Sequence, residues 1–384
     1  MSMRAQNALV LFKLESTPGV DALPTAANDA VAINNPKPPS FSPNIITTNE
    51  ATGSLDGLGP IVGGMTMSLQ LEIMLKGSGS PGVAPEWGKI LKACGWAETL
   101  TATPVPGSPE ACAAGGSTTL AVLGTSASST AQHYRGMPLV LAGTVPGTSF
   151  ISDYTSGKAA TLTDTMGGAI VATTNYQVPA NVLYSPASTG ISAGTTYYYL
   201  DGILYKMLGA RGTAKFELET NGVGKLMVNL QGMFGGKIDA AIPANPVFDA
   251  TRPPIYLNGK CLINRTVAAA SRFSLDDGIR LVFPDDPNAT EGIQAPLHTA
   301  RNMTGAVDPL ETLVATRDIM TDLRAGTRRI IHTRYGQVVG NRIGLTVPLG
   351  QYLNQDPSDR NGLAQVSVPF ACVGRDAGAF LCVY

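Results

Sequence analysis

The sequence predicts a mainly β protein with few helices, and two observations support this. Gly and Pro, which favour turns, number 43 and 27 among 384 residues. Short apolar runs recur in alternation with polar residues, as in half-buried strands, and helical patterns are few. Charged residues make up only 14% of the chain, against roughly 25% in an average soluble protein. So little charge favours either a surface that an assembly covers or a polar surface formed by Ser, Thr and Gly.

The charge balance and the cysteines narrow the class of protein further. The net charge is −1, so the chain lacks the basic excess of a dedicated nucleic-acid groove. No apolar run approaches the roughly 18 residues of a membrane span. The cysteines are odd in number and form no CxxC pair, and we expect reduced thiols in a cytosolic protein, without disulfides or a zinc site. They are Cys94, Cys112, Cys261, Cys372 and Cys382.

The first 60 residues are expected to form an extended N-terminal arm with loops. Five prolines precede residue 40, and such a segment is ordered only against another surface. Residues 63–75, GGMTMSLQLEIML, then alternate apolar with small or polar residues. This alternation predicts a strand with one buried face.

The stretch PEWGKILKACG (85–95) predicts a short helix, with Pro and Glu in its first turn and Gly at its end. Trp87, Ile90, Leu91 and Cys94 follow the spacing i, i+3, i+4, i+7 and form one apolar stripe. A nucleophilic cysteine needs a partly exposed, electropositive setting and a paired histidine. We therefore expect Cys94 to be a core residue.

Residues 101–194 differ in composition from their surroundings. A Pro-, Gly- and Ser-rich linker leads into short strands rich in Ser, Thr and Gly, with no helical pattern. This segment is expected to be a small inserted β-domain. It divides a first module, which comprises residues 61–100 and 195–240.

Residues 195–236 predict antiparallel strands joined by tight turns. The turns are expected at Asp201-Gly202, at the glycines around Arg211 and at Asn221-Gly222, since Asn-Gly between alternating runs is a strong hairpin signal. After a Pro-rich linker, residues 250–384 are expected to form a second module.

The second module contains what we expect to be the longest helix, residues 308–326, with Asp308 as its N-cap and Pro309 as its first residue. The order of strand, Pro-initiated helix and glycine-rich hairpin then occurs twice. In the first copy these parts are 63–75, 85–95 and 196–235. In the second they are 293–305, 308–326 and 327–350. This order suggests an internal duplication.

The titratable residues form no recognisable catalytic or metal-binding motif. None of the three histidines, His133, His298 and His332, has a second ligand at metal-binding spacing, and we expect surface or half-buried strand positions for them. Asp356 and Asp359 lie near each other without the pattern of a calcium loop, so a solvated turn is expected.

Gly209 and Gly212 lack the third glycine and the following helix of a dinucleotide site, and a hairpin turn is expected there. The sequence therefore predicts no catalytic, cofactor-binding or metal site, no cofactor, and a protein that is not an enzyme.

The order of these features resembles the major tail (tail tube) protein of long-tailed, non-contractile bacteriophages. The resemblance rests on ESTPGVDALPTAANDAVAI, LQLEIMLKGSG and APEWGKILKACGWAET, then on YYYLDGILYKMLGARGTAKFELETNGVGKLMVNLQGMF and VGNRIGLTVPLGQY. It covers the first hundred residues and 195–240 best, and the C-terminal third more loosely. These motifs concern order and composition, and the family has no catalytic motif to match.

The resemblance implies β-sandwich modules, each flanked by a helix, whose long strands join between subunits into a barrel around a lumen. The protein would be a structural virion component, assembled in the host cytoplasm, whose stacked rings form the conduit for DNA ejection. Its partners would be itself, the tape measure protein in the lumen, and tail terminator and baseplate proteins, with DNA only in passing and no membrane.

Family rings are usually six-fold, so two modules per chain predict a ring of three chains with pseudo-six-fold symmetry, and a ring of six chains is the alternative. The strands expected around the lumen are 63–75, 223–235, 293–304 and 338–350. The inserted domain would lie outside the tube, as decoration or a host contact.

Three other functions remain open at this stage. A tail terminator or baseplate-hub protein of the same particle would share the module but cap the tube. A carbohydrate-binding β-protein would use Trp87, Trp96 and the aromatic run TTYYYL (195–200). A hydrolase of unrecognised geometry is the third.

Overall fold

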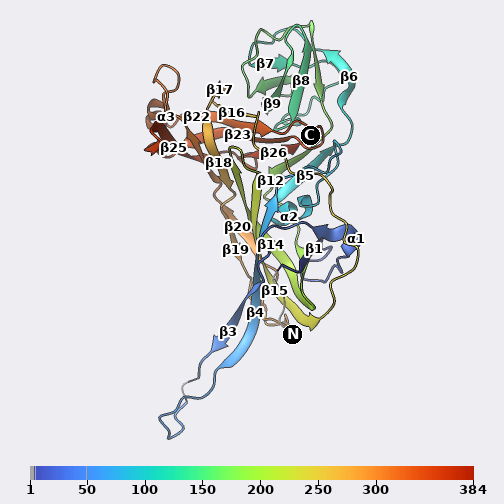
Figure 1. Cartoon of the computed structure of the whole chain (residues 1–384), viewed down its shortest axis with the longest axis vertical. Helices are drawn as coiled ribbons and strands as arrows, with labels where there is room; N and C mark the ends of the chain where they lie inside the picture. The colour runs from blue at the N-terminus through green and yellow to red at the C-terminus, as the bar shows by residue number, and fades with distance from the viewer. Residues whose placement is uncertain (1–3, 5, 49) are drawn as a thin grey trace.

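The computed structural model describes residue 4, residues 6–48 and residues 50–384, and it is mainly β. Strands account for 49% of the chain and helices for 4%, which confirms the predicted fold class. Figure 1 shows an elongated molecule, with the inserted domain at one end and a long hairpin projecting from the other.

The first half of the chain supplies a run of seven antiparallel strands. In order of pairing they are β2 (Ala30–Val31), β1 (Ala8–Leu14), β13 (Gly194–Leu200), β14 (Ile203–Glu219), β15 (Lys225–Asp239), β4 (Ile61–Met74) and β3 (Ser40–Ile46). Alternating apolar residues of β4 and β15 face one another in register, for example Leu69 with Leu230 and Ile73 with Leu226. These strands form because their apolar side chains recur every second residue and share one buried face.

The second half supplies a run with the same connectivity. In order of pairing the strands are β17 (Thr266–Val267), β16 (Lys260–Ile263), β22 (Arg328–Tyr335), β23 (Ile343–Tyr352), β25 (Leu363–Cys372), β21 (Thr304–Pro309) and β18 (Ala270–Asp276). Each strand of this run takes the place of one strand of the first run, in the same chain order.

A short helix follows the corresponding hairpin in both runs. The helix α2 (Gly88–Ala93) comes after the β3–β4 hairpin, and α3 (Ile319–Ala325) comes after the β18–β21 hairpin. The strand order therefore repeats within the chain. The matching elements differ from those expected, because the second copy of β4 is β21 and not residues 293–305.

The two runs join edge to edge through β14 and β18. The last five residues of β14, Lys215–Glu219, pair antiparallel with Arg272–Asp276 of β18. Along the same side of β14, its first half pairs with β13. One long strand thus links the two halves of the sheet.

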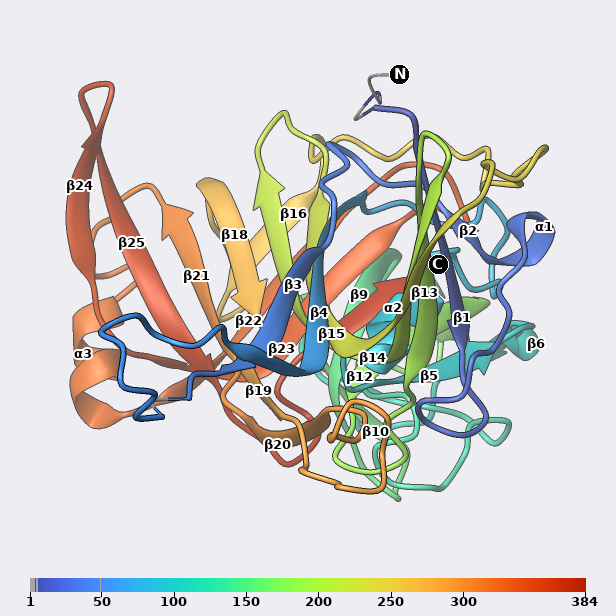
Figure 2. The same ribbon diagram turned by 90° about the horizontal axis from the view of Figure 1, so that it is seen from below.

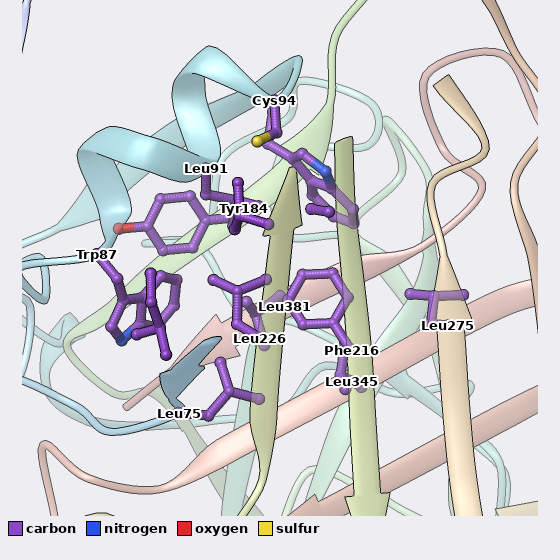
Figure 3. Close-up of a cluster of buried hydrophobic side chains, with 14 of the residues drawn as sticks. Leu75, Trp87, Leu91, Cys94, Tyr184, Phe216, Leu226, Leu275, Leu345 and Leu381 are labelled. Carbon is purple, nitrogen blue, oxygen red and sulfur yellow. The ribbon is translucent and has the colours of Figure 1, made fainter. Parts of the chain in front are cut away.

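A second layer covers the buried face of this sheet. It contains β26 (Phe380–Val383), β12 (Asn181–Pro186) and β5 (Trp96–Thr101), attached through the start of β23. Figure 3 shows Tyr184 and Leu381 from this layer packed with Phe216, Leu226 and Leu345. Both halves contribute to one hydrophobic core, so the two predicted modules fold as one body.

The inserted domain has a six-stranded sheet, and its hydrophobic core extends into the main body, where it includes Leu183 and Phe380. Its strands pair in the order β6 (Val105–Ala111), β11 (Thr174–Val178), β8 (Pro138–Gly143), β9 (Gly147–Tyr154), β10 (Ala159–Leu162) and β7 (Leu120–Val122). The domain thus spans about 105–178. The expected span of 101–194 was too wide, because β12 and the start of β13 pair within the main body.

The N-terminal segment also differs from the expected arm. Strand β1 lies inside the main sheet, where Val10 and Phe12 are fully buried, because its apolar run pairs with β13. Residues 15–39 then cross the body through α1 (Ala26–Asp29) and β2. Only β3 and the residues beyond it project.

Two further expectations about local structure were wrong. Residues 308–326 are not one helix: Asp308 and Pro309 end β21, and the helix begins after Asp318, whose side chain accepts a hydrogen bond from the Thr321 N–H. The glycines around Arg211 form no turn. Gly209, at a φ of 64°, lies in an irregularity of the continuous strand β14.

Candidate assembly surface

The outer side of β3 is an open sheet edge. Strand β3 pairs with β4 on one side, and no described strand pairs with the other. All seven of its residues are exposed, which leaves backbone N–H and C=O groups available for another strand.

The β3–β4 hairpin projects from one end of the molecule (Figure 1) and has large apolar side chains that are exposed to solvent. Large apolar residues exposed along it are Phe41, Ile45, Ile46, Leu55, Leu58, Ile61 and Val62. A row of this kind is unusual on a protein that stays monomeric, and it is typical of an interaction surface.

A second open edge lies at the opposite end of the sheet. Strand β24 (Asp356–Arg360) pairs only with β25 among the described strands, and all five of its residues are exposed. Figure 2 shows β24 at the left of the sheet, followed by β25, β21 and β18. A two-residue turn, Asn361-Gly362, joins β24 to β25 with both residues at positive φ.

This strand was not predicted from the sequence, although the Asn-Gly pair at 361–362 signals a hairpin. We expected a solvated turn around Asp356 and Asp359. The structure instead places both carboxylates on β24, and Asp359 Oδ1 accepts a hydrogen bond from the Gly362 N–H at 3.1 Å.

The internal repeat relates these two edges. Strand β15 runs along the whole of β14, and β25 likewise runs along the end of β23 and along β24. The second half of β14 therefore corresponds to β24. Since β18 corresponds to β3, the counterpart of the internal β14–β18 pair would be formed by β24 and β3, and each of these strands has one edge without a partner among the described strands.

The β14–β18 junction shows what such a pairing looks like when it is formed. On the buried face Phe216 and Leu218 of β14 lie opposite Leu275 and Phe273 of β18. On the other face the Glu217 carboxylate forms ion pairs with Lys215, at 2.7 Å, and with Arg272, at 3.3 Å. The junction thus combines ladder hydrogen bonds with an apolar face and a charged face.

A buried carboxyl completes this junction. Asp277 follows β18, and its Oδ2 accepts a hydrogen bond from the Ala214 N–H of β14 at 2.6 Å. Burial raises the pKa of Asp277 to about 8. The group therefore serves as a structural link between the halves, held away from solvent.

Cys94 lies in the core, as predicted. It is fully buried at the end of α2, in the same hydrophobic core as Trp87 and Leu91 (Figure 3). Burial, with a smaller contribution from the Asp277 charge, raises the pKa of its thiol well above the usual value. These surroundings suit packing and do not activate a nucleophile.

The histidines occupy three different environments. His133 is exposed and His298 is half-buried, but His332 is fully buried, so the expected surface or half-buried position was wrong for it. The inserted domain covers it, with the Phe150 ring centroid 4.5 Å from the imidazole. Its Nδ1 lies 2.9 Å from Thr346 Oγ1, and burial lowers its pKa to about 3.

The aromatic residues that could have bound a carbohydrate are buried. Trp87 and Trp96 lie in the core, and Tyr197, Tyr198 and Tyr199 are all less than a tenth exposed. They therefore offer no platform on which a sugar ring could stack. Within the described ranges, no group of three or more His, Cys, Asp or Glu side chains is placed to hold a metal ion.

The four strands expected around a lumen are not all in the main sheet. Residues 63–75 and 223–235 correspond to the adjacent strands β4 and β15, and 338–350 contains most of β23. Residues 293–304 instead contain β20 (Leu297–Arg301), which pairs with β19 (Ile279–Val282) in a separate two-stranded sheet. The strand that takes the position of β4 in the second half is β21.

Compared with known proteins, the chain matches no protein-family model and no curated protein sequence. Its function is therefore inferred from the geometry of the chain itself. Among the residues that the structure describes, no helix has the length and hydropathy needed to cross a membrane.

Proposed function

We propose that this chain is a structural subunit whose copies assemble into rings, and that the rings stack into a hollow tube like the tail tube of a long-tailed, non-contractile bacteriophage. One observation carries the proposal. The β14–β18 pair, which joins the two repeats within the chain, has a counterpart in the open edges of β24 and β3.

Pairing β24 of one copy with β3 of the next would repeat the internal junction between copies. Such a contact uses a different surface on each partner, so it continues from copy to copy until a ring closes. Closure pairs the open edges of β3 and β24, and exposed edges of this kind are a liability for an extended sheet. Each copy supplies two repeats, so three copies give a ring with pseudo-six-fold symmetry, and six copies remain the alternative.

The low charge of the chain fits this role. Much of the surface would be covered by neighbours, and a lumen without a basic excess would let DNA slide without binding its phosphates. The protein would be located in the virion, in contact with tape measure, terminator and baseplate proteins. A terminator or hub protein would close the same ring but would not extend it into a tube.

Disulfide trapping tests the proposed edge contact. One sample carries Ser42→Cys on β3, and a second carries a cysteine at Pro357, Ser358 or Asp359 on β24. Mixing the two under mild oxidation is expected to give a linked dimer for one β24 position and much less for its neighbours, since strand pairing has a defined register. Ser156→Cys, exposed in the inserted domain, is the matched control.

Electron microscopy across a concentration series tests the assembly itself. Stacked rings or tubes are expected, and three-fold or six-fold averages down the axis decide the number of copies. Isolated rings would favour the terminator or hub. Chains that stay dispersed at every concentration and form no β3–β24 crosslink above the Ser156 control would contradict the proposal.

A further inference from the structure

A positively charged cleft lies between the inserted domain and the main body. Its volume is about 410 Å³, and its floor includes the apolar residues Ile330, Pro348 and Leu349. Four arginines line it: Arg135 from the inserted domain, and Arg265, Arg328 and Arg329 from the main body. In a chain with so few charged residues, four arginines around one cleft are a notable concentration. We call this feature the arginine cleft.

The two walls of the arginine cleft are held together by a buried ion pair. Arg334 of β22 donates two hydrogen bonds, each 2.9 Å, to the carboxylate of Asp164 in the inserted domain. Lys260 approaches the same carboxylate at 3.2 Å. Paired buried charges with fork geometry fix the relative position of the elements that carry them. The cleft is therefore a built feature between two rigid walls.

Two of the arginines are oriented by carbonyl groups of the inserted domain. Arg135 Nε donates to the Ser152 carbonyl at 2.8 Å, and Arg265 Nε donates to the Leu162 carbonyl at 3.0 Å. Arg265 lies in the β16–β17 turn at a φ of 65°, a conformation that non-glycine residues seldom adopt. The turn thus directs this arginine across the junction.

The remaining charges leave the cleft positive. Arg329 is paired with Asp322, and the Asp153 carboxylate lines the cleft while accepting a hydrogen bond from Gln132. Arg328 is exposed. Three arginines thus face the cleft against one carboxylate.

The opposite end of the molecule carries the complementary chemistry. The hairpin tip (residues 47–48 and 50–60) has two acidic residues, Glu50 and Asp56, and residues 38–75 contain no Lys or Arg. Leu55 and Leu58 are exposed beside them. The tip therefore combines apolar side chains with negative charge, and the cleft combines an apolar floor with positive charge.

We propose that the hairpin tip of one copy binds in the arginine cleft of a copy in the neighbouring ring. The hairpin tip projects from one end of the long axis, and the inserted domain, which forms one wall of the arginine cleft, lies at the other (Figure 1). A tip therefore cannot reach its own cleft, but it can reach that of a copy stacked head to tail. This contact rests on the proposed tube function. It gives the inserted domain a role in stacking, in addition to any role on the outer surface.

Charge reversal tests the contact in the full-length chain. Arg328→Glu and Asp56→Lys, both at exposed positions, are each expected to raise the concentration at which rings stack by about tenfold, because a ring carries the contact several times. Combining the two changes in one chain is expected to restore stacking, since the reversed charges attract again. Arg280→Glu, an exposed arginine outside the cleft, is the matched control and should stack normally.

The readouts separate stacking from ring closure and from folding. Thermal unfolding should be unchanged in each variant, and electron microscopy should still show single rings. Normal stacking of both single variants, or a double variant no better than either, would overturn this inference and leave the proposed ring function intact. A wild-type chain that forms neither rings nor tubes would overturn both.

Discussion

Phe216 of β14 lies directly opposite Leu275 of β18, and both side chains are fully buried. This pair stands at the junction of the two repeats, where one half of the chain continues the sheet of the other. The junction joins the two repeats into one sheet with one hydrophobic core.

Removing this contact should weaken the whole molecule. Leu275→Ala deletes buried apolar volume from the shared core, and we expect a loss of about 3 kcal/mol in the free energy of unfolding. Denaturant unfolding should keep a single transition for the main body, because both halves share the core. Leu313→Ala, at an exposed position, should change stability by less than about 0.5 kcal/mol. Separate transitions for the two halves would contradict the single-core description.

Stability should depend on pH through Asp277. Its pKa rises from 3.8 to about 8 on folding, so the folded chain keeps a proton that the unfolded chain releases. The resulting stabilisation is complete below about pH 4 and is lost as the pH rises through 8. Asp277→Asn should flatten the profile between these values, because an amide does not titrate. Identical pH profiles for the variant and the wild type, measured by denaturant unfolding, would refute this assignment.

The buried Arg334–Asp164 pair should hold the inserted domain in place. Arg334→Met leaves Asp164 buried without its main partner, and we expect a loss of about 3–5 kcal/mol in the stability of the docked domain. Limited proteolysis in the linkers around residues 102–104 and 179–180 reports on the docking. Adding Asp164→Leu to Arg334→Met should recover part of the loss, because no unpaired charge then remains. A double variant that is cleaved faster than the single one would argue against this cause.

Docking of the inserted domain on the main body should also be sensitive to acid, because it depends on the ionised Asp164 carboxylate. Burial opposes ionisation of Asp164, but the charge of Arg334 prevails and the pKa of Asp164 lies below its usual 3.8. Its contribution is therefore present above about pH 4 and is lost as the pH falls through the lowered value. Cleavage of the linkers should accelerate at that acidic limit in the wild type. In the double variant that combines Arg334→Met with Asp164→Leu, the acceleration should be absent.

A substitution in the β24–β25 turn tests the proposed edge contact without changing the hydrophobic core. Gly362 has a φ of 84°, and Gly362→Val introduces a side chain that this conformation disfavours by roughly 1–2 kcal/mol. We expect faster hydrogen exchange across residues 356–367 and impaired ring formation, with core protection unchanged. Gly107→Ala, where φ is not positive and space is open, is the control. Normal rings despite a loosened β24 would count against the proposed edge contact.

Local sequence patterns were sufficient to predict several parts of the fold. The alternation in residues 63–75 predicted β4, and the spacing of Trp87, Ile90, Leu91 and Cys94 predicted the buried stripe of α2. Composition alone indicated a small β-domain inserted before β13. These features depend on neighbours within one turn or one strand, which a sequence displays directly.

Other parts of the fold could not be predicted from local sequence patterns. Pro309 resembles the first residue of a helix, yet it ends β21, because the strand pairs with β18 and β25. His332 alternates like a half-exposed strand residue, but a domain more than 150 positions away in the chain covers it. In both cases a distant partner outweighs the local preference.

The sequence by itself determined the mainly β class, the buried helix stripe, the inserted segment and the suggestion of a repeat, because each rests on residue spacing and composition. Only the tertiary structure decided which strands correspond, that both halves share one core, and that β3 and β24 are left open. Edges, junctions and the arginine cleft arise when residues far apart in the chain meet, and pairing of that kind depends on the arrangement of the whole sheet.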